Sequence, residues 1–231
     1  MSRLALPGAL LAAIAVAACS SAPQATPSPS AVPTVAATAA PTPTPTPAPT
    51  PHSSVNWTYK ALTEAGIGFT MPPGFRFQSA ASIRAELQAD LDSGQLPDTF
   101  VPLYKQEIEL IDSGFIVGAV SGHTTSATVS MGIFMTDAGP DLEASAKAIF
   151  KKLPTIPGQI ETDRRTVQLP IGPALRITIT TDPEGGVKAA GTAYIFHIPG
   201  DRAMLLQGAS PEGDNGFARM IDALVMTLEE L

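Results

Sequence analysis

The chain has 231 residues, of which 21 are acidic and 14 basic, for a formal net charge of −7. All the acidic residues and 13 of the basic ones lie in residues 54–231, which gives this part a net charge of −8. Such an acidic surface repels phosphate backbones and anionic headgroups. We therefore expect this part of the chain to bind neither nucleic acid nor a lipid surface directly. The single cysteine, Cys19, leaves residues 54–231 without a disulfide, a thiolate nucleophile or a cysteine metal site.

The first 18 residues have the composition of a signal peptide. Arg3 supplies a positive start, residues 4–18 form an almost purely apolar run, and small residues gather before Cys19. An apolar run of about 15 residues is shorter than the roughly 20 that a transmembrane helix needs. We therefore predict a signal peptide over residues 1–18 rather than a retained membrane span.

The four residues Val16-Ala17-Ala18-Cys19 resemble the lipobox of bacterial lipoproteins. The resemblance implies cleavage before Cys19 and attachment of lipid, such as palmitate, to its thiol. Two or three acyl chains give lasting attachment, at about 0.8 kcal/mol per buried CH₂, whereas one chain holds a protein only marginally. We expect Cys19 to anchor the chain to a membrane on its extracytoplasmic side, at the cell surface or in the periplasm. The alternative is a secreted protein in which this cysteine is incidental.

Residues 19–53 join the predicted lipid to the rest of the chain. They consist almost entirely of Pro, Thr, Ala and Ser and carry no Asp, Glu, Lys or Arg. Such a segment lacks the apolar area that would offset the entropy of ordering, so we predict a disordered tether. At about 3.1 Å per residue, as in extended polyproline, it reaches on the order of 100 Å. Residues 54–231 are then expected to form one globular domain.

The first elements predicted after the tether are two strands and two helices. Residues 55–59 alternate like a strand, and residues 67–71 form a second one that ends at Pro72-Pro73-Gly74. Ser79 is the expected cap of a helix, because apolar residues recur after it at i, i+4 and i+8 spacing. A second helix is expected to begin near Thr99, with a proline tolerated in its first turn.

Strands then alternate with one more helix. The apolar runs of residues 115–120 and 128–135 predict an antiparallel pair of strands. Asp141 is the expected cap of a helix that Pro154 ends. Short turns rich in Pro and Gly connect the runs that follow, and turns this short require antiparallel neighbours. The sequence therefore predicts a meander of four strands, over residues 166–169, 174–181, 188–198 and 203–207.

A final helix is predicted after the cap Asp214-Asn215, because apolar residues continue at i, i+3 and i+4 spacing from Phe217 to Leu228. An apolar stripe this wide must cover one face of a sheet. The predicted fold class is therefore α+β, with helices layered against a central antiparallel sheet and a C-terminal helix covering it.

The order of these elements, with the strand and corner of residues 67–75 at its start, is similar to that of the PsbP-like superfamily. That superfamily includes the extrinsic photosystem subunit and small bacterial lipoproteins. The resemblance extends over about residues 55–231 and implies an α-β-α sandwich around an antiparallel sheet, with binding or assembly roles more than catalysis. Members commonly carry Trp after the corner, where this chain has Phe75. The resemblance assigns no functional residue here.

Two histidines, His123 and His197, are the candidate general bases of residues 54–231. Ser121 lies two residues before His123, but it does not occupy the centre of a G-x-S-x-G elbow. We interpret Ser121 and His123 as exposed polar residues of a β-hairpin loop, and His197 as an edge or turn residue at a strand end. No catalytic residue is predicted, and the chain is not expected to be an enzyme.

Several carboxylates are candidates for a calcium site, although no run of residues matches an EF-hand loop. A site would have to be assembled in space, and solvated acids in turns are the alternative. No phosphate loop or dinucleotide fingerprint occurs, so neither a metal nor a cofactor is predicted. The acids concerned are Asp90, Asp92, Asp182, Glu184, Asp201, Glu212 and Asp214.

The leading hypothesis is a membrane-anchored binding or assembly module whose partner is an envelope protein or a small ligand. The alternative is a lipid or small-ligand carrier that uses a pocket between the sheet and its helices. An envelope hydrolase is a third hypothesis, which would need a pair of Glu or Asp residues in a cleft with His123.

Overall fold

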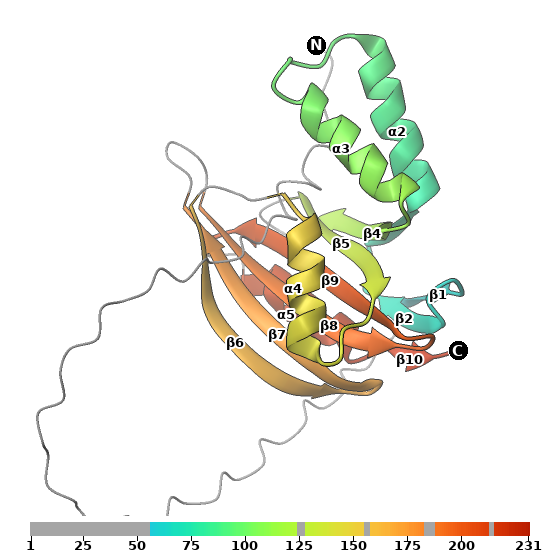
Figure 1. Cartoon of the computed structure of the whole chain (residues 1–231), viewed down its shortest axis with the longest axis vertical. Helices are drawn as coiled ribbons and strands as arrows, with labels where there is room; N and C mark the ends of the chain where they lie inside the picture. Colours follow the sequence, from blue (N-terminus) through green and yellow to red (C-terminus); the bar gives the residue numbers. More distant parts are fainter. Residues whose placement is uncertain (1–55, 124–127, 155–157, 183–187, 213–214) are drawn as a thin grey trace, which may run out of the picture.

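The structure is a computed structural model that describes residues 56–123, 128–154, 158–182, 188–212 and 215–231. The described chain forms a seven-stranded sheet, a three-stranded sheet and helices packed against them (Figure 1). None of the described helices is long and apolar enough to cross a membrane. The predicted signal peptide, lipidation site and tether lie outside the described residues.

The seven-stranded sheet is antiparallel throughout, in the order β3-β4-β5-β9-β8-β7-β6. The predicted hairpin of β4 and β5 and the predicted meander from β6 to β9 are both confirmed. The pairing extends several strands beyond their apolar runs. The strands are β3 (Arg76–Ser79), β4 (Ile116–His123), β5 (Thr128–Asp137), β6 (Gln159–Leu169), β7 (Gly172–Thr181), β8 (Ala189–Ile198) and β9 (Arg202–Pro211).

The three-stranded sheet joins the two ends of the described chain. Strand β2 (Ile67–Met71) lies between β1 (Thr58–Leu62) and β10 (Glu229–Glu230), and both pairs are antiparallel. The first strand was predicted over residues 55–59 and begins at Thr58. The strand β10 was not predicted, because two exposed glutamates carry no apolar pattern.

Four described helices complete the fold, and two of them begin at their predicted caps. The Ser79 hydroxyl accepts from the Ser82 N–H at 3.2 Å, and Asp141 Oδ1 accepts from the Ala144 N–H at 2.7 Å. The last helix ends at Val225, short of the predicted Leu228. The helices are α2 (Ala80–Ser93), α3 (Val101–Asp112), α4 (Leu142–Lys152) and α5 (Asn215–Val225).

Helices cover both faces of the large sheet, because successive strand residues alternate between two cores. Ile195 and Leu205 belong to the core under α2, α3 and α4, whereas their neighbours Phe196 and Leu206 belong to the core under α5 and the small sheet. The predicted α+β class, a sandwich around a central antiparallel sheet with the C-terminal helix covering one face, is confirmed (Figure 1).

Candidate functional site

A tight turn directs the chain from the small sheet onto the edge of the large one. The Phe75 N–H donates to the Pro72 carbonyl at 3.2 Å, and Gly74 between them has φ of 83°. A positive φ at this position is typical of a type II turn and favours glycine, which has no Cβ. The turn leaves Arg76 as the first residue of the edge strand β3.

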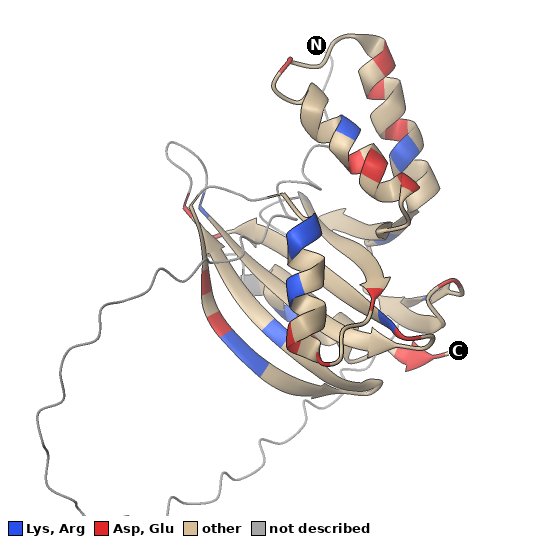
Figure 2. Ribbon diagram, viewed as in Figure 1, with Lys and Arg blue, Asp and Glu red and all other residues tan. Residues whose placement is uncertain are grey.

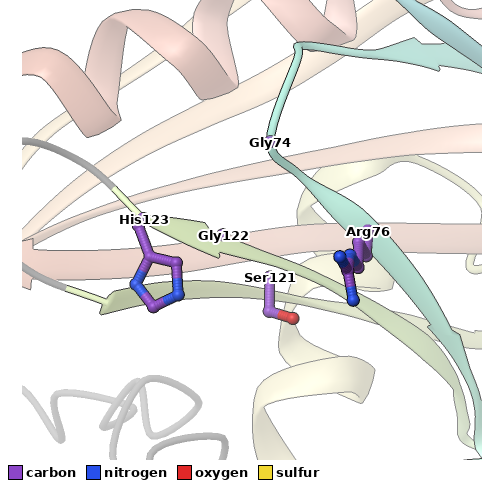
Figure 3. A pocket seen from close by; sticks show the side chains of 5 residues that line it. All are labelled: Gly74, Arg76, Ser121, Gly122 and His123. Carbon is purple, nitrogen blue, oxygen red and sulfur yellow. The ribbon is translucent and has the colours of Figure 1, made fainter.

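Strand pairing places three polar side chains on one face of the sheet. Arg76 of β3 lies directly opposite Ser121 of β4, and His123 follows Ser121 by two residues on the same strand. Cross-strand partners, and strand residues two apart, point to the same face. Figure 3 shows the three side chains projecting to the same side of the β3 and β4 ribbon.

These three side chains line a surface pocket of about 270 Å³ together with Gly74 and Gly122 (Figure 3). We call it the β3–β4 pocket. Arg76 and His123 are exposed and Ser121 is half-buried, so all three are accessible to a ligand. None of the described residues that line the pocket is a carboxylate.

The opposite face of the same ribbon is packed closely. A Cβ added to Gly122 would lie 2.6 Å from a ring carbon of Phe75, so this ring packs directly over the glycine backbone. Phe75 also packs against the core under α5. The aromatic residue of the corner therefore holds the turn against β4 and fixes where Arg76 enters the pocket.

The charge of Arg76 is not compensated within the described part of the chain. Arg76 has neither an ion pair nor a hydrogen bond there, whereas every other described arginine interacts with a partner. Figure 2 shows acidic and basic residues close together along β6. The other arginines pair as follows: Arg84 with Asp112, Arg164 with Glu143 and Glu161, Arg165 with Asp163, Arg176 with Asp222, and Arg202 with backbone carbonyls, while Arg219 also has an interaction.

The prediction that Ser121 and His123 belong to a hairpin loop was wrong. Both residues lie inside β4, where they pair with Ser130 and Thr128 of β5. The strand runs past its apolar residues because backbone hydrogen bonding to β5 continues. The connection between these strands, residues 124–127, lies outside the described residues.

His197 lies away from the pocket and is not an edge residue as predicted, since β8 pairs with both β7 and β9. Its Nε2 is 2.9 Å from the hydroxyl of Ser145 on α4. That hydroxyl accepts from the Gly139 N–H and donates to the Asp141 carbonyl, both at 2.9 Å. The Ser145 side chain is fully buried and its hydroxyl contacts His197, Gly139 and Asp141, so it fastens α4 to the sheet.

The acidic residues of the turns do not gather at one point in the described chain. No three His, Cys, Asp or Glu side chains there come together as a metal site. Asp182 instead forms an ion pair with Lys188, with 2.8 Å between Oδ2 and Nζ. Glu184 and Asp214, two of the candidate calcium ligands, lie outside the described residues.

Comparison with known proteins gives likenesses of fold. No protein-family model matches the chain, and no curated protein matches it significantly. The matching solved structures include the Ran-binding protein Mog1p of Saccharomyces cerevisiae, with a TM-score of 0.46, 11% identity and coverage of 77% of this chain and 96% of that one. They also include PsbP of the cyanobacterium Synechocystis sp. PCC 6803, with a TM-score of 0.46, 7% identity and coverage of 76% and 92%.

A third matching structure is LpqN of Mycobacterium tuberculosis, described as involved in cell envelope biogenesis. Its TM-score is 0.38, with 12% identity and coverage of 77% of this chain and 86% of that one. At these identities the likeness concerns the fold alone, and function is inferred from this chain's own residues.

Proposed function

We propose that this chain is an exported lipoprotein, anchored by lipid on Cys19, whose folded part is a non-enzymatic binding module that uses the β3–β4 pocket. The observation that carries this proposal is the convergence of Arg76, Ser121 and His123 in one accessible pocket. These residues come from strands separated by two helices in the sequence, so the fold itself assembles the site.

In the described structure, the buried Ser145 beside His197 is closed to a substrate, and Ser121 is not bonded to His123; both observations support binding rather than catalysis. Nucleophilic catalysis needs a hydroxyl within hydrogen-bond reach of its base. In the described part of the chain, the Ser121 hydroxyl makes no hydrogen bond to His123, although the two side chains share one face of β4. The pocket therefore presents donors and a fixed positive charge, which suit recognition of a partner.

The sequence before residue 54 supports a folded module that is attached to a membrane but held at some distance from it. A lipid on Cys19 would hold the chain, and residues 19–53 would let the module work at on the order of 100 Å from the anchor. The net charge of −8 on residues 54–231 disfavours close contact with anionic lipid. The partner is therefore expected in the envelope beyond the lipid surface.

Site-specific photocrosslinking in intact cells tests the binding role. A photoreactive residue in place of Ser121 should capture one discrete partner, and Arg76→Ala should reduce that adduct strongly. The matched control places the same residue at Thr166, an exposed position on β6 at the far edge of the sheet. Equal capture from both positions, or hydrolysis of an envelope polymer that His123→Ala abolishes, would overturn the proposal.

A further inference from the structure

We propose that the β3–β4 pocket binds a single oxyanionic group of its ligand, a phosphate or a carboxylate, with Arg76 as the cation and Ser121 and His123 as hydrogen-bond donors. This inference rests on the proposed binding function and names the chemistry that the site recognises.

The charge of Arg76 is the first reason. Residues 54–231 hold 21 acidic residues, and the other described arginines all have partners, whereas Arg76 has none in the described chain. A guanidinium presents parallel N–H groups that match the two oxygens of a carboxylate or phosphate. An unpaired arginine in an accessible pocket that has no carboxylate among its described lining residues is therefore suited to an oxyanion.

Hydroxyl groups on the neighbouring strands are the second reason. Ser121 lies between Arg76 on β3 and Ser130 on β5, so the three side chains form one row across the sheet. The Ser130 hydroxyl is buried and has no hydrogen-bond partner in the described chain. The row thus sets the Ser121 hydroxyl beside the cation in the pocket, with the buried Ser130 hydroxyl next in the row but outside the pocket lining, and His123 adds an imidazole at its open end.

The size of the pocket limits what it can hold. Sites for whole small molecules usually enclose about 300–1,000 Å³ and are largely apolar. The β3–β4 pocket has about 270 Å³, and two of the five described residues that line it are glycines. It therefore suits one charged group on a larger molecule rather than a complete apolar ligand. The same reasoning disfavours a lipid chain as the occupant of this pocket.

A titration of the lipidated full-length chain in detergent micelles tests the inference, with ¹H–¹⁵N NMR as the readout. Inorganic phosphate and acetate serve as probes of the two oxyanions, and vesicles with and without phosphatidylglycerol distinguish a lipid headgroup from a free oxyanion. We expect phosphate or acetate to shift the Arg76, Ser121 and His123 signals, with Kd on the order of 1 mM because one charged group supplies few contacts.

Matched variants separate recognition from general charge effects. Arg76→Ala should weaken binding about tenfold or more, and Arg76→Lys should weaken it less, because lysine keeps the charge but loses the fork of donors. The control Arg165→Ala, an exposed arginine on β6, should leave binding unchanged. Preserved NMR signals elsewhere in the spectrum verify that each variant is folded.

Equal affinity in Arg76→Ala and the wild type would overturn the oxyanion inference. Binding only to vesicles that contain phosphatidylglycerol, lost in Arg76→Ala, would instead identify the oxyanion as a lipid headgroup. If the photoreactive residue at Ser121 still captures a partner while neither phosphate nor acetate binds, the inference fails and the binding function stands. If neither capture nor oxyanion binding occurs, both fail.

Discussion

The phenolic hydroxyl of Tyr194 donates a 2.6 Å hydrogen bond to Asp222 Oδ1, and this contact fastens α5 to β8. Arg176, the cross-strand partner of Tyr194 on β7, contacts both residues. Its Nε is 2.9 Å from the Tyr194 hydroxyl, and one of its terminal nitrogens is 3.2 Å from Asp222 Oδ1. Burial and then the hydrogen bond to Asp222 raise the pKa of the Tyr194 hydroxyl, so it remains a donor at all physiological pH values.

Removing the carboxylate of Asp222 should destabilise the fold, because the Arg176 side chain is only 13% exposed and would lose its counter-charge. For Asp222→Ala we expect the free energy of unfolding to fall by about 1–3 kcal/mol, and for Tyr194→Phe by about 1 kcal/mol. Urea denaturation measures both. Asp98→Ala, which changes an exposed loop acid, is the control, and a loss no larger than in this control would contradict the assigned role of the network.

Glu107 on α3 should make stability depend on pH. Its side chain is fully buried, neither carboxyl oxygen has a hydrogen-bond partner in the described chain, and burial raises the pKa of Glu107 to about 7. The facing helix α2 carries Arg84, but Asp112 of α3 engages this guanidinium through two hydrogen bonds. Glu107 is therefore expected to be buried in its neutral form.

The sign of the pH effect follows from proton binding. The folded chain keeps this proton up to about pH 7, whereas the unfolded chain loses it near the ordinary value of 4.5. Between pH 4.5 and 7 the unfolded state binds fewer protons than the folded state. The stabilisation by the neutral Glu107 is therefore fully present below pH 4.5 and is lost as the pH rises through 7. The free energy of unfolding falls by about 3 kcal/mol at most.

Urea denaturation between pH 4 and 9 checks this prediction. Glu107→Gln should remove this part of the pH dependence, whereas Glu109→Gln, an exposed neighbour on the same helix, should retain it. A Glu107→Gln profile that parallels the wild type would contradict the assignment.

The contact between Gly122 and Phe75 predicts a cost for any side chain at position 122. In Gly122→Ala the new Cβ meets the base of the Phe75 ring, which cannot swing away without leaving the core, so we expect a loss of about 1–3 kcal/mol. In a Phe75→Leu background, Gly122→Ala should lower the free energy of unfolding by less than it does in the wild type. Ser121→Ala, on the adjacent pocket-facing position, should stay within about 0.5 kcal/mol.

Mass spectrometry of the protein from its native membrane should find lipid on Cys19 as the first residue. Cys19→Ser should give an unlipidated chain in the soluble fraction. A Cys19→Ser chain that keeps its membrane attachment would show that another feature anchors it.

Elements with strong local chemistry were predictable from the sequence. Ser79 and Asp141 were recognised as caps because a cap needs only the side chain and the N–H groups that follow it. The end of α5 was not, because Thr227 terminates it through tertiary contacts. Its hydroxyl donates to the Leu224 carbonyl and accepts from the N–H of Thr70, which is distant in the sequence.

The pocket was only half predictable. His123 and Ser121 stood out as a histidine and a serine close together, but Arg76 precedes Ser121 by 45 residues and becomes their neighbour only through the pairing of β3 with β4. The strand β3 has four residues and no apolar alternation, so nothing local indicated it. Likewise β6 was predicted from Thr166 and begins at Gln159, because its first half is a largely exposed edge strand.

The small sheet decides how the folded part responds to tension on its N-terminal side. The chain enters the fold through β1, which is joined to β2 by five residue pairs and is an edge strand of the small sheet. A pull on the residues before Thr58 is therefore borne first by this short ladder. The strand β1 can peel away while β2, held by β10 and α5, keeps its place. Under the anchoring proposed at Cys19, a load on the tether would therefore reach the β1–β2 ladder before the strands that line the β3–β4 pocket.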